Sequence, residues 1–243
     1  MKAFAAALAL VALAGCDVAG KPGGDSTREF PEPDRPVSDL GGNAFSTEDQ
    51  RDSRGEAESI MRLAEIEPGM AVADIGAGEG YYTVRLSEKV GATGRVLAQD
   101  IDRDALTALG ERVVRERLDN VSIKQGQTDD PLLPENSFDR VFMVHMYHEI
   151  EEPYAFLWHL WPALKKGGQI VVVDVDRPTD EHGIAPLLLS CEFESVGYRL
   201  VAFKDAPELA GYYAQFERAA KRPEPKQIKP CKGAVPEPGA PTG

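Results

Sequence analysis

Three glycines at alternating positions separate a short apolar run from two tyrosines, in the stretch VADIGAGEGYY at residues 72–82. Glycine adopts positive φ and lets a ligand approach the backbone without a Cβ in the way. A helix that begins at Tyr81 would direct its free N–H groups and its positive dipole end at a ligand on the turn. Asp74, just before the turn, would repel a pyrophosphate but not a cation. The stretch therefore predicts a ligand site at a strand–turn–helix junction and favours a cationic ligand over a pyrophosphate.

A second acidic residue, Asp100, ends the apolar run RVLAQ twenty positions after Gly80. A carboxylate at this place can accept hydrogen bonds from both hydroxyls of a ribose. The G-x-G-x-G spacing followed by Tyr81 differs from the G-x-G-x-x-G of dinucleotide binders, which disfavours a nicotinamide oxidoreductase. The turn and Asp100 together predict a nucleoside-containing ligand.

With these motifs the chain resembles the class I methyltransferases that depend on S-adenosylmethionine (SAM), from about Ser46 to Arg218. The motifs that carry the resemblance are VADIGAGEGYYT, GRVLAQDID, FDRVFMVHMYHEI and LKKGGQIVVVDVD. The resemblance implies SAM as the cofactor and assigns Asp100 to its ribose. It implies further contacts to the methionine part and its ammonium (Asp74, Gly76, Gly78, Gly80) and to the adenine (Ile101, Gln127, Thr128).

Two histidines and a tyrosine follow the expected fourth strand, where the resemblance places the methyl acceptor. Methyl transfer from a sulfonium is an in-line displacement that requires positioning and, for a protonated acceptor, a base. Histidine titrates near neutrality and suits that role. We predict His148 as the base, with His145 and Tyr147 lining the acceptor pocket. Arg51 and Arg54 are candidates to pair with the SAM carboxylate, although a role as solvated surface charges fits them equally well.

The composition restricts the partners. The 243 residues carry a formal net charge of −13, which argues against nucleic acid, since phosphate binding needs a basic face. It is compatible with a small-molecule methyl acceptor. No N-P-P-Y motif follows the fourth strand, which argues against methylation of amino groups in DNA bases or glutamine side chains. Oligomeric state is left open by the sequence.

Strands and helices alternate along the middle of the chain, which predicts an α/β fold with a doubly wound, mostly parallel seven-stranded sheet, helices on both faces and an antiparallel last strand. Ser53 and Glu56 form a capping-box candidate before the first helix. We expect strands at 70–75, 95–99, 121–124, 138–143, 170–175, 198–203 and 212–216, and helices at 57–64, 81–90, 103–118, 153–164 and 184–196. Gly167 and Gly168 are expected to end the fourth of these helices.

The N-terminus has the pattern of a secretory signal peptide, with Lys2, a twelve-residue apolar run and small residues at its end. Its last residues, Leu13-Ala14-Gly15-Cys16, resemble a bacterial lipobox, which implies lipidation of Cys16 and a lipoprotein on the periplasmic side of a membrane. Asp17 slightly favours the inner membrane. We expect a signal peptide at 1–15, a lipidated Cys and flexible linker at 16–45, a methyltransferase domain at 46–218 and a disordered proline-rich tail at 219–243.

Two further cysteines, Cys191 and Cys231, remain after such processing. Export would permit a disulfide between them, but Cys191 falls on the apolar face of its expected helix, which favours two free thiols. No group of Cys and His has metal-ligand spacing, so no metal site is predicted. The leading hypothesis is a lipid-anchored, SAM-dependent methyltransferase acting by O- or C-methylation. A lipoprotein that binds SAM or another nucleoside without turnover is the alternative, because SAM is made in the cytoplasm.

Overall fold

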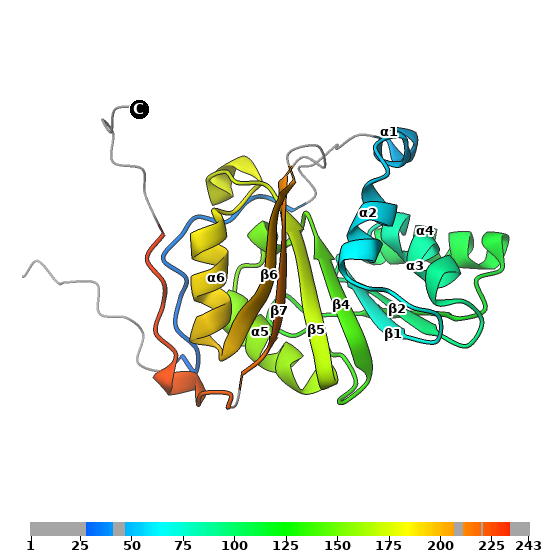
Figure 1. Cartoon of the computed structure of the whole chain (residues 1–243). Coiled ribbons are helices and arrows are strands. Elements are labelled where there is room, and N and C mark those ends of the chain that lie inside the picture. Colours follow the sequence, from blue (N-terminus) through cyan, green and yellow to red (C-terminus); the bar gives the residue numbers. More distant parts are fainter. Residues whose placement is uncertain (1–27, 41–46, 207–210, 220, 234–243) are drawn as a thin grey trace, which may run out of the picture.

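The structure is a computed structural model that describes residues 28–40, 47–206, 211–219 and 221–233. Its seven-stranded sheet has the order β3-β2-β1-β4-β5-β7-β6 (Figure 1). The strands are β1 (Ala71–Ile75), β2 (Arg95–Asp100), β3 (Val121–Gln125), β4 (Phe138–Val144), β5 (Leu164–Asp174), β6 (Tyr198–Ala206) and β7 (Gly211–Arg218). The first five strands pair in parallel, whereas β7 is antiparallel to both β5 and β6. The predicted fold class is confirmed.

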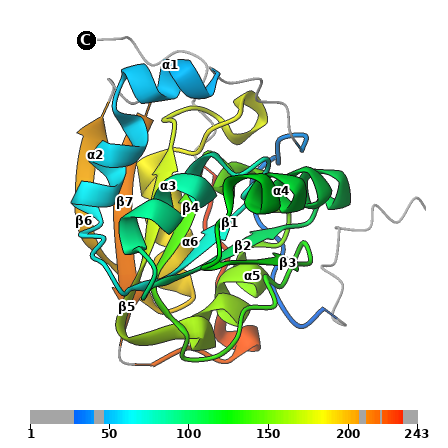
Figure 2. The ribbon, with the colours of Figure 1, turned by 90° about the vertical axis from the view of Figure 1, so that its right-hand side faces the viewer.

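Helices cover both faces of the sheet. Helices α5 (Pro153–Leu160) and α6 (Pro186–Ser195) lie on one face, and α2 (Glu56–Leu63), α3 (Tyr81–Val90) and α4 (Arg103–Glu116) lie on the other, the side turned toward the viewer in Figure 2. On β5, Ile170 and Val172 belong to the first hydrophobic cluster, and Val171 and Val173 belong to the second. Because both faces of this part of β5 are buried, residues 170–173 form a continuous apolar run.

One short helix was not predicted. Helix α1 (Glu48–Ser53) buries no residue, so it has no apolar period to detect, and it begins at a capping box of Thr47 and Gln50. The predicted capping box at Ser53 and Glu56 is wrong, because Ser53 ends α1 and Gly55 is the N-cap of α2.

The predicted strand at 170–175 begins earlier than expected. Helix α5 ends at Leu160, and the 3₁₀ turn η2 (Trp161–Ala163) leads directly into β5 at Leu164. Gly167 and Gly168 therefore lie within β5 and do not end a helix. A Cβ at Gly168 would lie 2.6 Å from the carbonyl oxygen of Phe138, so this glycine permits close approach of β4.

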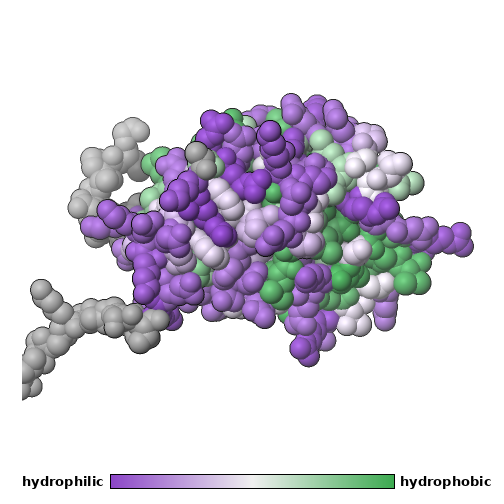
Figure 3. Space-filling model, turned by 90° about the horizontal axis from the view of Figure 1, so that it is seen from below, coloured by the Kyte–Doolittle hydropathy of each residue, from purple (hydrophilic) through white to green (hydrophobic). Residues whose placement is uncertain are grey.

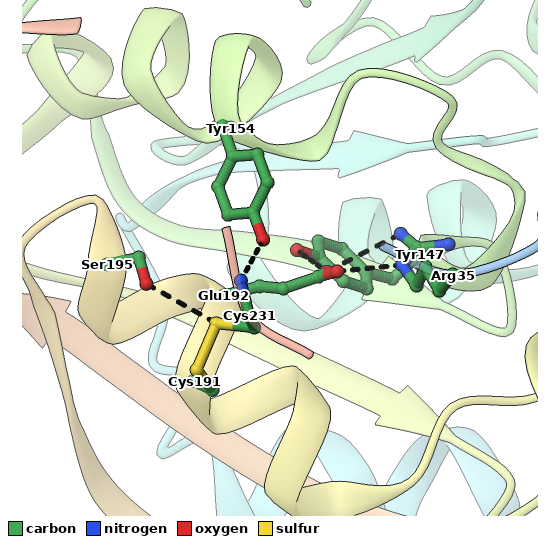
Figure 4. Close-up of a disulfide and its surroundings, with 7 residues drawn as sticks. All are labelled: Arg35, Tyr147, Tyr154, Cys191, Glu192, Ser195 and Cys231. Atoms are coloured by element: carbon green, nitrogen blue, oxygen red, sulfur yellow. Dashed lines mark hydrogen bonds and ion pairs between the residues drawn. A yellow bond between two sulfur atoms is a disulfide. The ribbon is translucent and has the colours of Figure 1, made fainter. Parts of the chain in front are cut away.

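Two segments outside the sheet pack against the α6 side. Residues 28–40 and 221–233, the latter with the 3₁₀ turn η5 (Pro225–Gln227), run side by side and meet in a bridge between Asp34 and Lys232 (Figure 1). Cys231 forms a disulfide with Cys191 of α6 (Figure 4). The predictions of a flexible linker and a disordered tail are wrong for these ranges, and the prediction of two free thiols is also wrong. A disulfide closing a loop of this size contributes roughly 2–4 kcal/mol of stability.

The predicted signal peptide and the lipidation site Cys16 lie outside the described residues. Within the described ranges, no helix combines the length and the apolar content that crossing a bilayer requires. Seen from below, the surface is mostly hydrophilic, with a hydrophobic area toward the side on which β1 and β2 lie in Figure 1 (Figure 3).

Candidate active site

A cavity of about 620 Å³ opens beyond the carboxyl ends of β1, β2 and β4. This is where ligands bind in open α/β sheets. Six of the predicted cofactor residues line it: Gly76, Gly78, Asp100, Ile101, Gln127 and Thr128. Other lining residues come from the segments before β1, from the end of β4 and the turn after it, and from α5: Leu40, Arg51, Val144, His145, Met146, Glu149, Ile150, Glu151 and Phe156.

The three glycines of the turn, Gly76, Gly78 and Gly80, have different structural roles. All three adopt positive φ, but only Gly76 and Gly78 reach the cavity. A Cβ at Gly76 would lie 2.9 Å from Cγ of Met146, so this glycine permits contact between the ends of β1 and β4. At Gly80 a Cβ would lie 2.4 Å from Cδ1 of Leu109 in α4. Gly80 is therefore a packing residue and does not line the cavity as the resemblance implied.

Asp100 holds the glycine turn in place. Its Oδ2 accepts a hydrogen bond from the backbone N–H of Gly78 at 2.8 Å, and its Oδ1 accepts one from Asp102 at 3.0 Å. Each carboxylate oxygen can accept a second hydrogen bond. The side chain can therefore bind ribose hydroxyls while it fixes the turn.

Asp74 is buried behind the turn, 3% exposed, and does not line the cavity. Its Oδ2 accepts a hydrogen bond from Oγ1 of Thr83 at 2.6 Å. Burial raises the pKa of Asp74 to about 7, against the lowering by the Thr83 hydrogen bond. Asp74 thus connects β1 to α3. Its side chain does not reach the cavity, so it does not contact a ligand ammonium there as the resemblance implied.

The raised pKa of Asp74 gives a pH-dependent prediction. Between the ordinary carboxyl pKa of 3.8 and about 7, the folded chain keeps a proton that the unfolded chain has lost, so the contribution of Asp74 to stability falls as pH rises through this window. Asp74→Asn cannot ionise, and we expect its unfolding free energy, relative to the natural chain, to be higher at pH 8 than at pH 5. Denaturant titrations at both pH values check this, and an equal difference at the two would contradict it.

The residues after β4 separate into a cavity wall and a buried layer behind it. His145 lines the cavity, adopts positive φ (54°), and burial lowers its pKa. Tyr147 is fully buried and donates a hydrogen bond to Oε2 of Glu192 at 2.8 Å, so the prediction that it lines the pocket is wrong. His148 is also fully buried and outside the cavity lining, with Nδ1 at 2.9 Å from Oδ1 of Asp174.

Arg51 lines the cavity, and its side chain also binds neighbouring residues. Its Nε donates to Oε1 of Glu56 at 3.1 Å, and its guanidinium lies 3.7 Å above the ring of Tyr81. Tyr81 in turn donates to Oδ1 of Asp52 at 2.9 Å. These contacts fix α1 and α2 over the start of α3. Arg54 is exposed and does not line the cavity.

The cavity is strongly acidic. Among the described residues, one arginine, Arg51, lines it beside five carboxylates: Glu79, Asp100, Asp102, Glu149 and Glu151. This charge balance suits a ligand with cationic groups and opposes a pyrophosphate, because like charges at close range repel. Sequence reasoning missed Glu149 and Glu151, although both follow the histidines directly in the motif HMYHEIEE.

The fold and this site have the features of a class I SAM-dependent methyltransferase. A family model described as a methyltransferase domain matches residues 72–168, the part of the chain that holds β1 to β4 and the start of β5. The family match identifies a methyltransferase domain over this part of the chain.

The names of the curated relatives specify a class of substrate. The chain is 27% identical over 121 residues to a demethylmenaquinone methyltransferase of Listeria monocytogenes serotype 4a, which covers 50% of this chain and 51% of the relative. It is 29% identical over 123 residues to a ubiquinone/menaquinone biosynthesis C-methyltransferase of Shewanella frigidimarina, which covers 50% of this chain and 49% of the relative. The chain therefore spans about half the length of the curated relatives it matches.

Solved structures share the fold. A SAM-dependent methyltransferase from Aquifex aeolicus matches with a TM-score of 0.61 at 24% identity, covering 71% of this chain and 97% of that one. A [4+2]-cyclase, SpnF, matches with the same TM-score of 0.61 at 14% identity, covering 79% of this chain and 90% of that one. Because a cyclase shares the fold, methyl transfer must be argued from the site.

Proposed function

We propose that the chain transfers a methyl group from SAM to a small-molecule acceptor. The observation that carries this proposal is the acidic cavity at the glycine turn, in which five carboxylates accompany one arginine. SAM carries a sulfonium and an ammonium, so this charge suits it. Asp100 lies where it can bind the ribose, with Ile101 and Gln127 in the same wall for the adenine.

The acceptor end of the cavity combines apolar and polar groups. Met146, Ile150, Phe156 and Leu40 supply apolar surface, and His145 also lines the cavity. We infer a lipophilic, ring-bearing acceptor, and the names of the menaquinone and ubiquinone methyltransferase relatives support a quinol-type compound. C-methylation and O-methylation are both compatible with this wall.

His145 is the better candidate for proton acceptance. It lines the cavity, and its lowered pKa keeps the imidazole neutral at pH 7, the form that accepts a proton. Since His148 lies behind the wall, we assign the role of base to His145 in place of His148.

A matched pair of histidine variants tests this assignment. His145→Asn removes the base and tolerates positive φ, so we expect turnover to fall about 10²–10⁴-fold with unchanged SAM affinity. The measurement is transfer of labelled methyl from SAM to a demethylated quinol in detergent, with His159→Asn, outside the cavity, as the control. Equal turnover in the two variants would overturn the base assignment. SAM binding by the natural chain with no transfer to any quinol or phenol would favour the alternative, a SAM- or nucleoside-binding lipoprotein.

We further propose that the protein works outside the cytoplasm, anchored at a bacterial membrane through lipid on Cys16. The disulfide between Cys191 and Cys231 supports this, because disulfides persist mainly in oxidising compartments. The lipobox-like residues before Cys16 support it independently.

Fractionation of producing cells tests the location. We expect the natural chain in the membrane fraction and Cys16→Ala in the soluble fraction, since a lipid chain supplies the affinity for the bilayer. Alkylation of thiols before lysis should leave Cys191 and Cys231 unmodified. Alkylation of both cysteines, with the natural chain in the cytosolic fraction, would contradict an exported lipoprotein.

A further inference from the structure

Two histidines and a glutamate converge behind the acceptor end of the cavity. His148 and Glu149 come from the 3₁₀ turn η1 (Tyr147–Glu149), and His182 follows the 3₁₀ turn η3 (Thr179–Glu181). One ligand atom from each of the three lies within 4.8 Å of the others. His148 and His182 are far apart in the sequence, so spacing alone gave no sign of the cluster, and it is the fold of β4 and β5 that joins them.

The ring of His148 is oriented for ligation. Its Nδ1 lies 2.9 and 3.0 Å from the two carboxylate oxygens of Asp174, at the end of β5. With Nδ1 held there, Nε2 faces Glu149, 4.0 Å from Oε1. A carboxylate that accepts from one ring nitrogen while the other nitrogen binds a metal is the common second-shell arrangement of histidine ligands.

His182 is fixed beside that ring. The two imidazoles meet edge to face, with centroids 5.8 Å apart. Among the described residues, Nδ1 of His182 is buried and has no hydrogen-bond partner, although buried ring nitrogens normally have one. His182 adopts positive φ (58°), and its backbone N–H donates to Oγ of Ser38 at 3.2 Å. Ser38 in turn donates to the carbonyl oxygen of Thr179. Such backbone strain persists where the surroundings enforce it and is common at functional sites.

The donor set identifies the class of ion. Two imidazoles and one carboxylate form a set that binds Zn²⁺ with one position left open, at ligand distances of roughly 2.0–2.2 Å. The ligand atoms around a tetrahedral ion are roughly 3.3–3.6 Å apart at those distances. The three ligand atoms here lie within 4.8 Å of one another, so each side chain would have to move by less than about 1 Å to bind the ion. Glu149 and Asp174 supply two negative charges for a divalent cation.

We propose that His148, Glu149 and His182 bind one divalent transition-metal ion, for which Zn²⁺ is the best match, with Asp174 positioning His148. Glu149 lines the cavity, so the open coordination position lies on the acceptor side. There it would take water or an oxygen atom of the acceptor. That last consequence rests on the proposed function, whereas metal binding itself does not.

Zinc titration of the disulfide-intact, untagged chain tests the proposal after removal of bound metal with a chelator. We expect one Zn²⁺ per chain, measured by competition with a chromogenic chelator and by elemental analysis, and a higher melting temperature with Zn²⁺. His182→Ala and Glu149→Gln should each weaken Zn²⁺ binding at least 100-fold. Asp174→Asn should weaken it 10–100-fold, the range for a lost second-shell partner. His159→Ala, outside the cluster, should bind as the natural chain does.

Two results overturn the metal site: less than half an equivalent of Zn²⁺ on the natural chain, or equal affinity in the natural chain, His182→Ala and Glu149→Gln. The use of two ligand variants keeps the test decisive if one of them does not fold. SAM titration of the same samples separates the two proposals. Zinc binding without SAM binding would contradict only the proposed methyltransferase activity. SAM binding without zinc binding would contradict only the proposed metal site.

Discussion

Arg35→Met is expected to lower the free energy of unfolding by about 3–5 kcal/mol, the cost of leaving a buried ionic partner unpaired. Nε of Arg35 lies 2.8 Å from Oε1 of Glu192, and both side chains are 1% exposed. The guanidinium also donates to the carbonyl oxygens of His148 and Ile150 at 3.4 and 3.3 Å. Figure 4 shows that Arg35 reaches Glu192 next to the disulfide. Without Arg35, the Glu192 carboxylate would have to be buried uncompensated or protonated.

The same substitution at Arg28 is the matched control. Arg28 is 46% exposed and pairs with Glu32 at 2.9 Å, so Arg28→Met should cost less than about 1 kcal/mol. Adding Glu192→Gln to Arg35→Met removes the orphaned charge and keeps an acceptor for Tyr147, so part of the loss should return. Denaturant unfolding measures all four proteins. Equal stabilities of the two single variants would mean that residues 28–40 do not pack as described.

Asp100→Ala should weaken SAM binding at least tenfold. Hydrogen bonds to a charged group contribute about 1.5–3 kcal/mol each, and every 1.4 kcal/mol is tenfold in affinity. The substitution also removes the acceptor that fixes the N–H of Gly78, which adds to the loss. Calorimetric titration of the variant with SAM and with S-adenosylhomocysteine gives both affinities.

Asp104→Ala is the control for the lost charge. Asp104 is exposed in the first turn of α4 and does not line the cavity, so its variant loses the same charge without the ribose partner. We expect Asp104→Ala to bind SAM with the same affinity as the natural chain. If both variants bound SAM equally well, the ribose assignment of Asp100 would be wrong.

The features that the sequence predicts correctly are those that depend on a short run of consecutive residues. The apolar run at β5, the glycine turn and the acidic end of β2 each follow from a short stretch, because strand burial and positive φ are properties of consecutive residues. The sheet, the helices on its two faces and six residues of the cavity lining are therefore predictable from the sequence.

The rest depends on contacts between distant residues. A proline-rich segment without periodicity is typical of disorder. Residues 28–40 are nevertheless held by contacts that include the buried Arg35, and residues 221–233 by contacts that include the disulfide. Similarly, the spacing of His145 and His148 cannot show which of the two faces the cavity. The 3₁₀ turn after β4 decides this by turning Tyr147 and His148 inward.

Calorimetric titration of the chain from Asp17 onward with SAM and with S-adenosylhomocysteine tests the central claim most directly. The acidic cavity and the turn held by Asp100 predict one site per chain with micromolar affinity for both ligands. Absence of binding to either would contradict a SAM-dependent methyltransferase and would leave the cavity to a different cationic or nucleoside ligand.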